Sequence, residues 1–351
     1  MHFYLYEYLF GYTWIIYRCR TTPPPMSGFH FFFVAVPYSV IFVVGLMGNT
    51  AVLTYILFLT KSLKGSIFSL GNTLVYVLAL SLVDLMVIFS IPFHLTSILM
   101  ANWVYGTISC KAYWVLEMSN KLCSAFILTA MAFDRYMAVC HSNVTWVHSI
   151  RSTVIIIIGS LFISVFIITP VIYLSRVAQV PMSEAYNGSF SVCLIERNFC
   201  SDGMTRNFRY WFSVLIFVFA FLLPAVSLCF CYIKMSFSLR KKARSLMQSH
   251  IPIGRVTTYA FTVIIFFLLS QAPYWITQIY TTFLLFINQS FGNVIYITYI
   301  CHMCPFLAAA LNWILYARMN TQVRKGLSMA NEHYSRDIRR YVMLLPMRLV
   351  F

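Results

Sequence analysis

The chain has 351 residues, of which only 10% are charged, whereas soluble globular proteins carry about 25%. Its 25 Lys and Arg outnumber its nine Asp and Glu, so the formal net charge at pH 7 is +16. Residues of the AVILMFWYC set make up 60% of the chain, more than the interior of a soluble fold can bury. This composition excludes an ordinary cytosolic enzyme, a disordered chain and a secreted disulfide scaffold, and it indicates a membrane protein with several spans.

The first 30 residues differ from the rest of the chain. Residues 1–17 are apolar and aromatic, but Glu7 interrupts them, and neither a basic n-region nor a small-residue cleavage site accompanies them. The run is also short for a membrane span. We therefore expect residues 1–30 to be an extracellular N-terminal segment, with a mis-assigned first exon as the alternative.

Seven mainly apolar runs follow, each long enough to supply the about 20 residues that a transmembrane helix needs. Their approximate limits are 31–60, 69–99, 107–140, 152–175, 207–236, 254–286 and 291–317. The runs predict an all-α membrane protein, in which residues 31–317 form a seven-transmembrane helix bundle. We expect residues 318–351 to form a short cytoplasmic helix and tail.

Basic residues predict the orientation of the bundle, because cytoplasmic connections carry an excess of Lys and Arg. The larger set is Lys61, Lys64, Arg151, Lys234, Arg240, Lys241, Lys242, Arg244, Arg255 and the basic residues of the tail. This set predicts an N-terminus outside the cell and a C-terminus inside. Glycosylation sequons at Asn187 and Asn288 then fall outside, where they can be used, and the sequon at Asn143 falls inside. The basic residues form no single face, so nucleic acid is not an expected partner.

Several polar and charged residues interrupt the apolar runs. An ionised side chain at the centre of a bilayer costs at least about 2.5–3.5 kcal/mol, so residues of this kind are candidates for function. They include Asp84 in the second run, Glu117, Lys121 and Asp134 in the third, and Asn312 in the seventh.

Short motifs recur along the runs in a fixed order. They are Gly48-Asn49, Leu78-Ala79 leading to Asp84, Trp103, Cys110, Asp134-Arg135-Tyr136, Pro224, Tyr232, Phe267, Pro273, Asn312 and Tyr316. In this order and spacing, residues 31–325 resemble the rhodopsin-like (class A) family of G-protein-coupled receptors. The resemblance implies a multi-pass plasma-membrane receptor that binds a ligand outside the cell and a heterotrimeric G protein inside.

The resemblance also implies a set of residues that switch the receptor. Arg135 would pair with Asp134 at rest and turn toward Tyr232 and the G protein in the active state. Tyr136, Phe267, Pro273, Asn312 and Tyr316 complete this set. Prolines remove helix hydrogen bonds and permit kinks, and a kink at Pro273 would let the inner end of helix six swing outward.

Two further features are implied by the family pattern. Asp84, Asn120, Ser124 and Asn312 match the family's internal sodium pocket, and their oxygen atoms suit a hard cation. A water-filled polar network is the alternative, since Lys121 could compete with sodium for Asp84. No other cofactor is expected.

Cysteines on the outer face predict disulfides, because that compartment is oxidising. Cys110 and Cys193 match the disulfide that joins helix three to the second outer loop in the family. Cys19 and Cys200 would then form a second bridge or remain free thiols.

Glu117 is the main candidate for contact with a ligand. It lies five helical turns before Arg135, on the same stripe of the helix. In amine, opioid and somatostatin-type receptors this position carries an aspartate that binds a cationic group of the ligand. Lys121, four residues further on, can neutralise Glu117 instead, and both interpretations stay open. The other expected ligand contacts are Lys121, His94, Gln271, Tyr274, Trp275, Gln278 and His302.

The second outer loop, roughly residues 176–206, is long and polar, and loops of this length are often functional. Together with the large, mixed pocket it favours a neuropeptide ligand, as in somatostatin, galanin, opioid and allatostatin-C receptors, and this resemblance favours a Gi/o protein. A chemosensory or small-molecule receptor of the same fold and a transporter are the alternatives. An opsin is disfavoured, because Phe306 stands where retinal needs a lysine, and no enzyme-like constellation is present.

Some positions depart from the family pattern. Trp313 replaces the usual proline of helix seven, and Pro305 lies eight residues before it. Gln271 replaces the usual tryptophan of helix six, so it would respond to ligand by hydrogen bonding, for example with Lys121.

Overall fold

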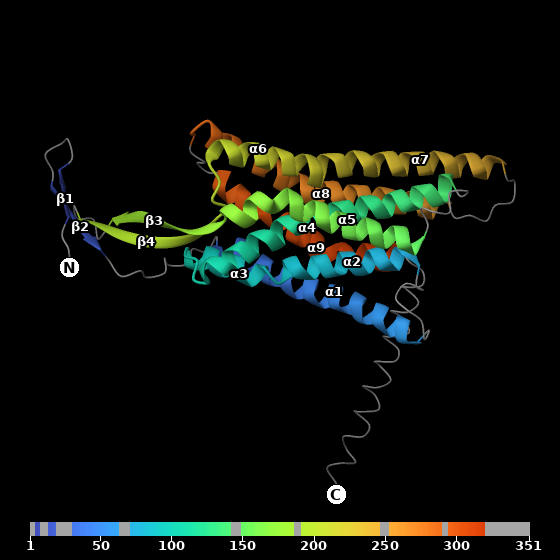
Figure 1. Cartoon of the computed structure of the whole chain (residues 1–351), viewed down its shortest axis with the longest axis horizontal. Coiled ribbons are helices and arrows are strands. Elements are labelled where there is room, and N and C mark those ends of the chain that lie inside the picture. Colours follow the sequence, from blue (N-terminus) through green and yellow to red (C-terminus); the bar gives the residue numbers. More distant parts are fainter. Residues whose placement is uncertain are drawn as a thin grey trace, which may run out of the picture.

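A computed structural model describes residues 4–7, 13–18, 30–62, 71–141, 149–185, 191–245, 253–289 and 294–319. Its long helices lie side by side along one axis, and a small sheet extends from one end of them (Figure 1). Within these ranges, seven segments are long and apolar enough to cross a membrane. The seven-helix bundle expected from the sequence is therefore confirmed.

Seven crossings make up the bundle, and three of them combine more than one helical element. The first joins the π-helix η1 (His30–Ala35) to α1 (Val36–Ser62), and the second joins α2 (Asn72–Ile88) to α3 (Ile91–Met100). The third is α4 (Gly106–Cys140) and the fourth α5 (Ile150–Leu174). The fifth combines α6 (Arg206–Phe217), η3 (Val218–Leu222) and α7 (Leu223–Ser245). The sixth is α8 (Ile253–Phe286) and the seventh α9 (Val294–Met319).

Prolines account for the two interruptions within crossings two and five. Pro92 stands in the first turn of α3, where its missing N–H is tolerated but where α2 cannot continue through it. The break is closed by Ser90, whose backbone N–H and hydroxyl both donate to the Val87 carbonyl, at 3.0 and 2.7 Å. In crossing five, the π-helical segment η3 comes just before Pro224. The helix irregularity expected at this proline is therefore a π-bulge.

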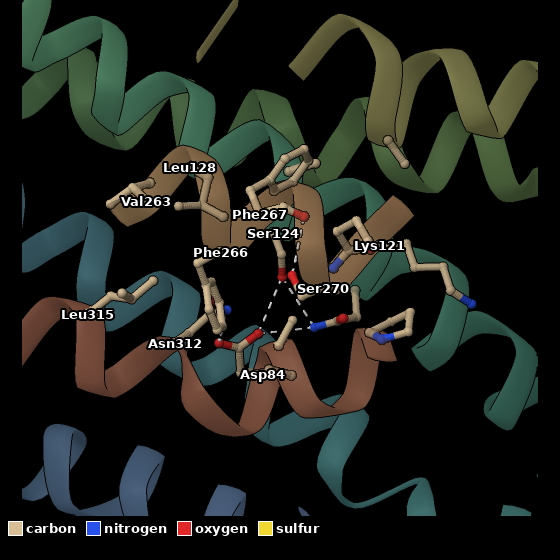
Figure 2. Close-up of a pocket in the computed structure, with 17 residues that line it drawn as sticks. Asp84, Lys121, Ser124, Leu128, Val263, Phe266, Phe267, Ser270, Asn312 and Leu315 are labelled. Atoms are coloured by element: carbon tan, nitrogen blue, oxygen red, sulfur yellow. Dashed lines mark hydrogen bonds between the residues drawn. The ribbon is translucent and has the colours of Figure 1, made fainter. Parts of the chain in front are cut away.

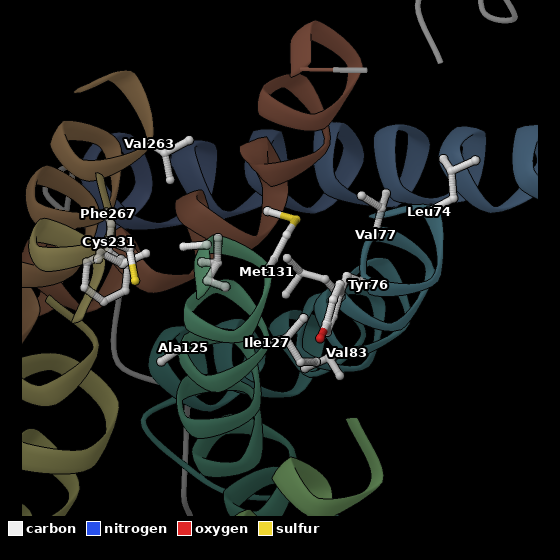
Figure 3. Packing of buried hydrophobic residues seen from close by; sticks show 14 of the residues in the cluster. Leu74, Tyr76, Val77, Val83, Ala125, Ile127, Met131, Cys231, Val263 and Phe267 are labelled. Atoms are coloured by element: carbon white, nitrogen blue, oxygen red, sulfur yellow. The ribbon is translucent and has the colours of Figure 1, made fainter. Parts of the chain in front are cut away.

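The half of the bundle farther from the sheet has a continuous apolar core (Figure 3). Tyr76 and Met131 are buried there between α2 and α4, and Tyr232 and Phe267 add to it from α7 and α8. By contrast, Phe162 and Phe166 on α5 are 79% and 78% exposed. Exposed phenylalanines of this kind suit a helix that faces lipid, as a membrane-embedded bundle requires.

A four-stranded sheet stands outside the bundle, in the order β1-β2-β4-β3. Its strands are β1 (Tyr4–Glu7), β2 (Thr13–Arg18), β3 (Arg176–Ala185) and β4 (Ser191–Ser201). The strands β3 and β4 form an antiparallel hairpin, and β2 pairs in parallel with β4. The all-α prediction therefore holds for the bundle but missed these strands, which occupy the N-terminal segment and the second outer loop.

A disulfide at the end of the bundle nearer the sheet joins Cys110 to Cys200, so the expected pairing of Cys110 with Cys193 is wrong. The hairpin register gives the reason. Cys200 lies opposite Val177, at the base of the hairpin where β3 leaves the bundle, whereas Cys193 lies opposite Glu184. Seven residues of strand separate the two cysteines, which corresponds to about 23 Å. The alternative bridge between Cys19 and Cys200 is excluded by the same observation.

The base of the hairpin is also held by hydrogen bonds to the connection between α3 and α4. The Trp103 N–H donates to the Asn198 carbonyl at 2.7 Å, and the Asn198 N–H donates to the Asn102 side chain at 2.8 Å. Arg197 donates to the Met100 carbonyl at 3.1 Å. The first outer loop thus fixes the second one in place beside α4.

Candidate ligand and transducer sites

A buried polar cluster lies in the half of the bundle nearer the sheet, with Glu117 and Lys121 of α4 at its centre. These side chains form an ion pair although they are only 2% and 6% exposed. The Lys121 ammonium also lies over the ring of Tyr274, 4.4 Å from its centroid. The structure therefore brings both members of the expected pair together, and each charge already has a partner of opposite sign or a π face.

His302 of α9 links Glu117 to the first crossing. Its Nε2 lies 3.0 Å from the Glu117 Oε1 atom, and its Nδ1 lies 2.8 Å from the Tyr38 hydroxyl. An ionised carboxylate only accepts hydrogen bonds, so Nε2–H donates to Glu117 and Nδ1 can accept from Tyr38. A neutral imidazole satisfies both contacts. The cluster of Glu117, Lys121 and His302 then has no net charge.

His94 of α3 packs against His302 of this network. Its ring stacks on that of His302, with centroids 4.6 Å apart, and the Tyr113 hydroxyl lies 2.9 Å from its Nδ1. Sequence reasoning named His94 and His302 but missed Tyr38 and Tyr113. Both tyrosines are polar side chains near the outer ends of apolar runs, which is the signal that could have identified them.

Four buried polar atoms of this region have no hydrogen-bond partner among the described residues. They are Glu117 Oε2, His94 Nε2, Trp114 Nε1 and Trp275 Nε1. Leaving a buried donor or acceptor unpaired costs about 1–3 kcal/mol. Donors and acceptors left open in the interior are therefore an unusual feature, and they require an explanation.

A cavity of about 40 Å³ adjoins the cluster between α4, α5, α6 and α8. Both indoles, Trp114 and Trp275, line it together with Gln278. At its rim Arg209 forms a two-pronged ion pair with Asp202, with Nε 2.6 Å from Oδ2. Tyr274, Trp275 and Gln278 were expected at this position, whereas Trp114, Asp202 and Arg209 were not.

A second cavity, of about 20 Å³, surrounds Asp84 deeper in the bundle (Figure 2). The carboxylate is 1% exposed and accepts from Asn120 and Ser124 at 3.3 Å and from Asn312 at 2.9 Å. The four residues predicted to form one polar pocket are therefore in contact. All three of these partners are neutral, and the cavity has room for about one water-sized occupant.

Gln271 and Pro305 line the same cavity, and so does part of Lys121. Figure 2 shows the Lys121 side chain directed away from Asp84, and its ammonium is the group that pairs with Glu117. The structure thus places Lys121 between the two acids, and its contacts there are with Glu117 and Tyr274 rather than with Gln271.

The opposite end of the bundle holds the Asp134-Arg135-Tyr136 motif, at the end of α4. Asp134 is buried and accepts a hydrogen bond from Asn72 at 3.3 Å. The Arg135 Nε atom is buried without a hydrogen-bond partner among the described residues. The Tyr136 hydroxyl lies 3.2 Å from the His141 ring nitrogen.

The remaining residues of the predicted switch lie near this motif or along α8 and α9. Tyr232 and Phe267 belong to one apolar cluster, and the ring of Phe267 stacks on that of Phe221. Pro273 lies within α8. Tyr316 belongs to α9, but its side chain lies outside those that the structure describes.

Trp313, which replaces the usual proline, packs against Gly48 of α1. The space beside Gly48 is filled by the indole, so that a Cβ atom there would overlap with its ring. The glycine thus allows a bulky side chain on α9 to lie directly against the backbone of α1.

The two outer sequons differ in what the structure describes. Asn288 lies in the turn that follows α8, has a positive φ of 62° and is exposed, and its side-chain oxygen accepts from Arg206. Asn187 and Asn143 lie outside the described residues.

Comparison with known proteins places the chain in a family. Residues 48–316 match the model of the 7 transmembrane receptor (rhodopsin family). Over 86% of the chain, it is 32% identical to the probable G-protein coupled receptor C06G4.5 of Caenorhabditis elegans and spans 70% of that protein. Neuropeptide receptor 18 of the same organism is 27% identical over 82% of the chain and 65% of its own length. Galanin receptor type 1 of Homo sapiens is 28% identical over 87% of the chain and 83% of its own length.

These matches agree with the seven crossings of the bundle. The family match covers most of the bundle, including α4 with both the Glu117 and the Asp134 regions. The chain therefore belongs to the rhodopsin family of seven-transmembrane receptors, and it is a multi-pass protein of the plasma membrane and not an enzyme.

Proposed function

We propose that this receptor binds an extracellular peptide in the outer half of the bundle and activates a heterotrimeric G protein of the Gi/o class. The observation that carries the proposal is the set of four unpartnered polar atoms around Glu117 and the adjoining cavity. Two of them are indole N–H donors and one is a carboxylate oxygen that accepts. A ligand with both acceptors and donors would therefore complement the site.

A peptide has this property along its whole length, because each residue other than proline carries one N–H and one C=O. A purely apolar ligand would leave the Glu117 oxygen and both indole groups unpaired and buried. The names of three relatives, a neuropeptide receptor, a galanin receptor and a somatostatin receptor, support the same ligand class.

In this proposal the N-terminus and the sheet lie outside the cell, and the end of α4 with Arg135 lies inside. The excess of basic residues on that side supports this orientation. Ligand shifts a pre-existing equilibrium between two helix arrangements, with α8 bending at Pro273 and opening a cleft beside Arg135. The Arg135 Nε atom, which has no hydrogen-bond partner among the described residues, and the electrostatic interaction of Arg135 with Tyr232 support a role for both in that cleft.

The Asp84 cavity is part of the same proposal. A buried carboxylate that has only neutral partners is costly, and a small cation would offset its charge. Asp84 and the Ser124 hydroxyl would hold sodium there, with Asn120 and Asn312 turning their amide oxygens toward the ion.

The test is to express the receptor in cells with a promiscuous G protein and to screen a library of neuropeptides. We expect a peptide response that Arg135→Ala abolishes, because this change removes the side chain expected to contact the G protein. Lys61→Ala is the matched control, since it also removes one positive charge, from an exposed side chain in the last turn of α1. Purified G proteins of each class, added to membranes that hold the receptor, would then identify the class by nucleotide exchange.

Other outcomes would contradict the proposal. A response to volatile or other small molecules and to no peptide would make the chain a chemosensory receptor of the same fold. Solute uptake without nucleotide exchange would indicate a transporter. A peptide response that survives Arg135→Ala would remove Arg135 from the transducer site.

A further inference from the structure

Lys121 lies between two buried acids that belong to different sites. Its ammonium pairs with Glu117, one turn toward the outer face, while part of its side chain lines the cavity of Asp84. Around the axis of α4, Lys121 is about 40° from Glu117 and about 60° from Ser124, which bonds to Asp84. Lys121 therefore shares one stripe of α4 with Glu117 and with Ser124, the partner of Asp84.

The contact with Glu117 is the arrangement that α4 itself favours. Helical side chains lean toward the N-terminus, and the acid four residues earlier is the natural partner of Lys121. The ring of Tyr274, 4.4 Å away, adds a second favourable contact at the same place. His302 also contacts the Glu117 Oε1 atom, so this oxygen has two partners, Lys121 and His302.

Asp84 is the nearest alternative that the cavity offers. It is buried, it has only neutral partners among those described above, and the space beside it holds about one water-sized group. A primary ammonium is such a group. It donates up to three hydrogen bonds and suits a carboxylate next to a hydroxyl.

We propose that Lys121 is a tethered cation that moves its ammonium from Glu117 to Asp84 in either of two cases. In the first, Glu117 loses its negative charge; in the second, Glu117 forms an ion pair with a cationic group of the ligand. In the second case the inference rests on the proposed function, because it needs a ligand with a basic group. The ammonium of Lys121 then takes the place of sodium, so that occupation of the ligand site expels the ion through one side chain. The movement follows from charge balance. If the cation of the ligand and the Lys121 ammonium both lay beside Glu117, Asp84 would remain buried without a cation.

The proposal can be tested without any ligand or G protein, so its failure is distinct from failure of the proposed function. The full-length receptor is purified in lipid nanodiscs, and its Tm is measured in NaCl and in choline chloride at equal ionic strength. We expect sodium to raise the Tm of the wild type and to have no effect on Asp84→Asn. In Glu117→Gln the sodium effect should be lost, because Lys121 has moved to Asp84.

Two variants distinguish displacement by Lys121 from general damage. The double variant Glu117→Gln/Lys121→Met should regain the sodium effect, because no tethered cation is left to fill the cavity. His302→Gln is the matched control, since it disturbs the same network but keeps the Glu117 charge, and it should respond to sodium like the wild type.

Each other result overturns the proposal. A sodium effect that persists in Glu117→Gln means that Lys121 does not move, and an effect that stays absent in the double variant means that Lys121 is not the competitor. An effect found in Lys121→Met but absent from the wild type means that Lys121 already occupies Asp84 at rest. No sodium effect in any variant means that the cavity does not take a cation at all.

Discussion

Asn49 shows how a single buried amide joins two helices of the bundle. It is fully buried in α1, and its Nδ2 donates to the Gly45 carbonyl at 3.0 Å and to the Ala309 carbonyl of α9 at 3.1 Å. The second bond crosses between helices, where the hydrophobic effect does not drive association and polar contacts contribute directly. Asn49 is thus a fixed point between the first and last crossings.

We expect Asn49→Ala to lower the free energy of unfolding by about 0.6 kcal/mol, the average for an interhelical bond in membranes, since one bond between helices is lost together with one bond inside α1. Thermal unfolding of the purified receptor measures this loss. The matched control is Thr54→Ala on the same helix, because the Thr54 hydroxyl bonds only to the Thr50 carbonyl of its own helix. Equal effects of the two changes would show that the bond between helices contributes nothing.

At the scale of elements, the contacts described above hold the β3–β4 hairpin to the bundle at its base. The Cys110–Cys200 disulfide and the hydrogen bonds of Asn198 and Arg197 all gather there, next to α4. The far end of the hairpin, with Cys193, extends away from the helices (Figure 1). The register of two strands, rather than the spacing along the chain, therefore decides which cysteine can reach Cys110.

This arrangement predicts different results for two similar substitutions. Cys200→Ser should free the Cys110 thiol, which a membrane-impermeant maleimide would then label on intact cells after mild unfolding. Cys193→Ser should leave Cys110 protected, because its disulfide is intact. Labelling of Cys110 in the Cys193 variant and not in the Cys200 variant would restore the pairing expected from the family pattern.

At the scale of the whole molecule, the charge of the chain is distributed unequally between the two ends of the bundle. The exposed Arg240 and Lys241 lie near the end of α7, beyond the length that a bilayer would cover. The connection between β3 and β4 and the one after α8 carry the sequons at Asn187 and Asn288. The proposed orientation therefore has a direct chemical consequence.

We expect N-linked glycans on the outer sequons alone. Enzymatic removal of N-glycans should reduce the apparent mass of the receptor on a gel. This shift should disappear in the double variant Asn187→Gln/Asn288→Gln and should be unchanged in Asn143→Gln, because Asn143 would face the cytoplasm. A shift that depends on Asn143 would reverse the orientation.

The sequence predicted the bundle well because each crossing is a long apolar run, and length with composition is sufficient to identify such a helix. The resemblance to the receptor family also grouped Asp84, Asn120, Ser124 and Asn312, which are in contact in the structure. The strands of the second outer loop were missed because their mixed polar composition has no clear period. The choice between Cys193 and Cys200 failed for the same reason.

The partner of Lys121 could not be decided from the sequence, because Glu117 and Asp84 are both acids within predicted helices. Spacing along α4 favours Glu117, but the contact with Tyr274 depends on how α8 packs against α4. Tyr38 and Tyr113 were missed because their role depends on partners on other helices. Contacts between helices distant in sequence are thus the part that a single sequence leaves open.

The close fit of Trp313 against Gly48 has a consequence for descent with modification. Any residue other than glycine at position 48 would overlap with the indole, so that change is acceptable only in a lineage that has already lost the tryptophan. The reverse order is open, because a smaller residue at position 313 leaves glycine in place with a gap beside it. Substitutions at the two positions therefore have a required order. The tryptophan at position 313 is replaced first, and the glycine at position 48 can be replaced only afterwards.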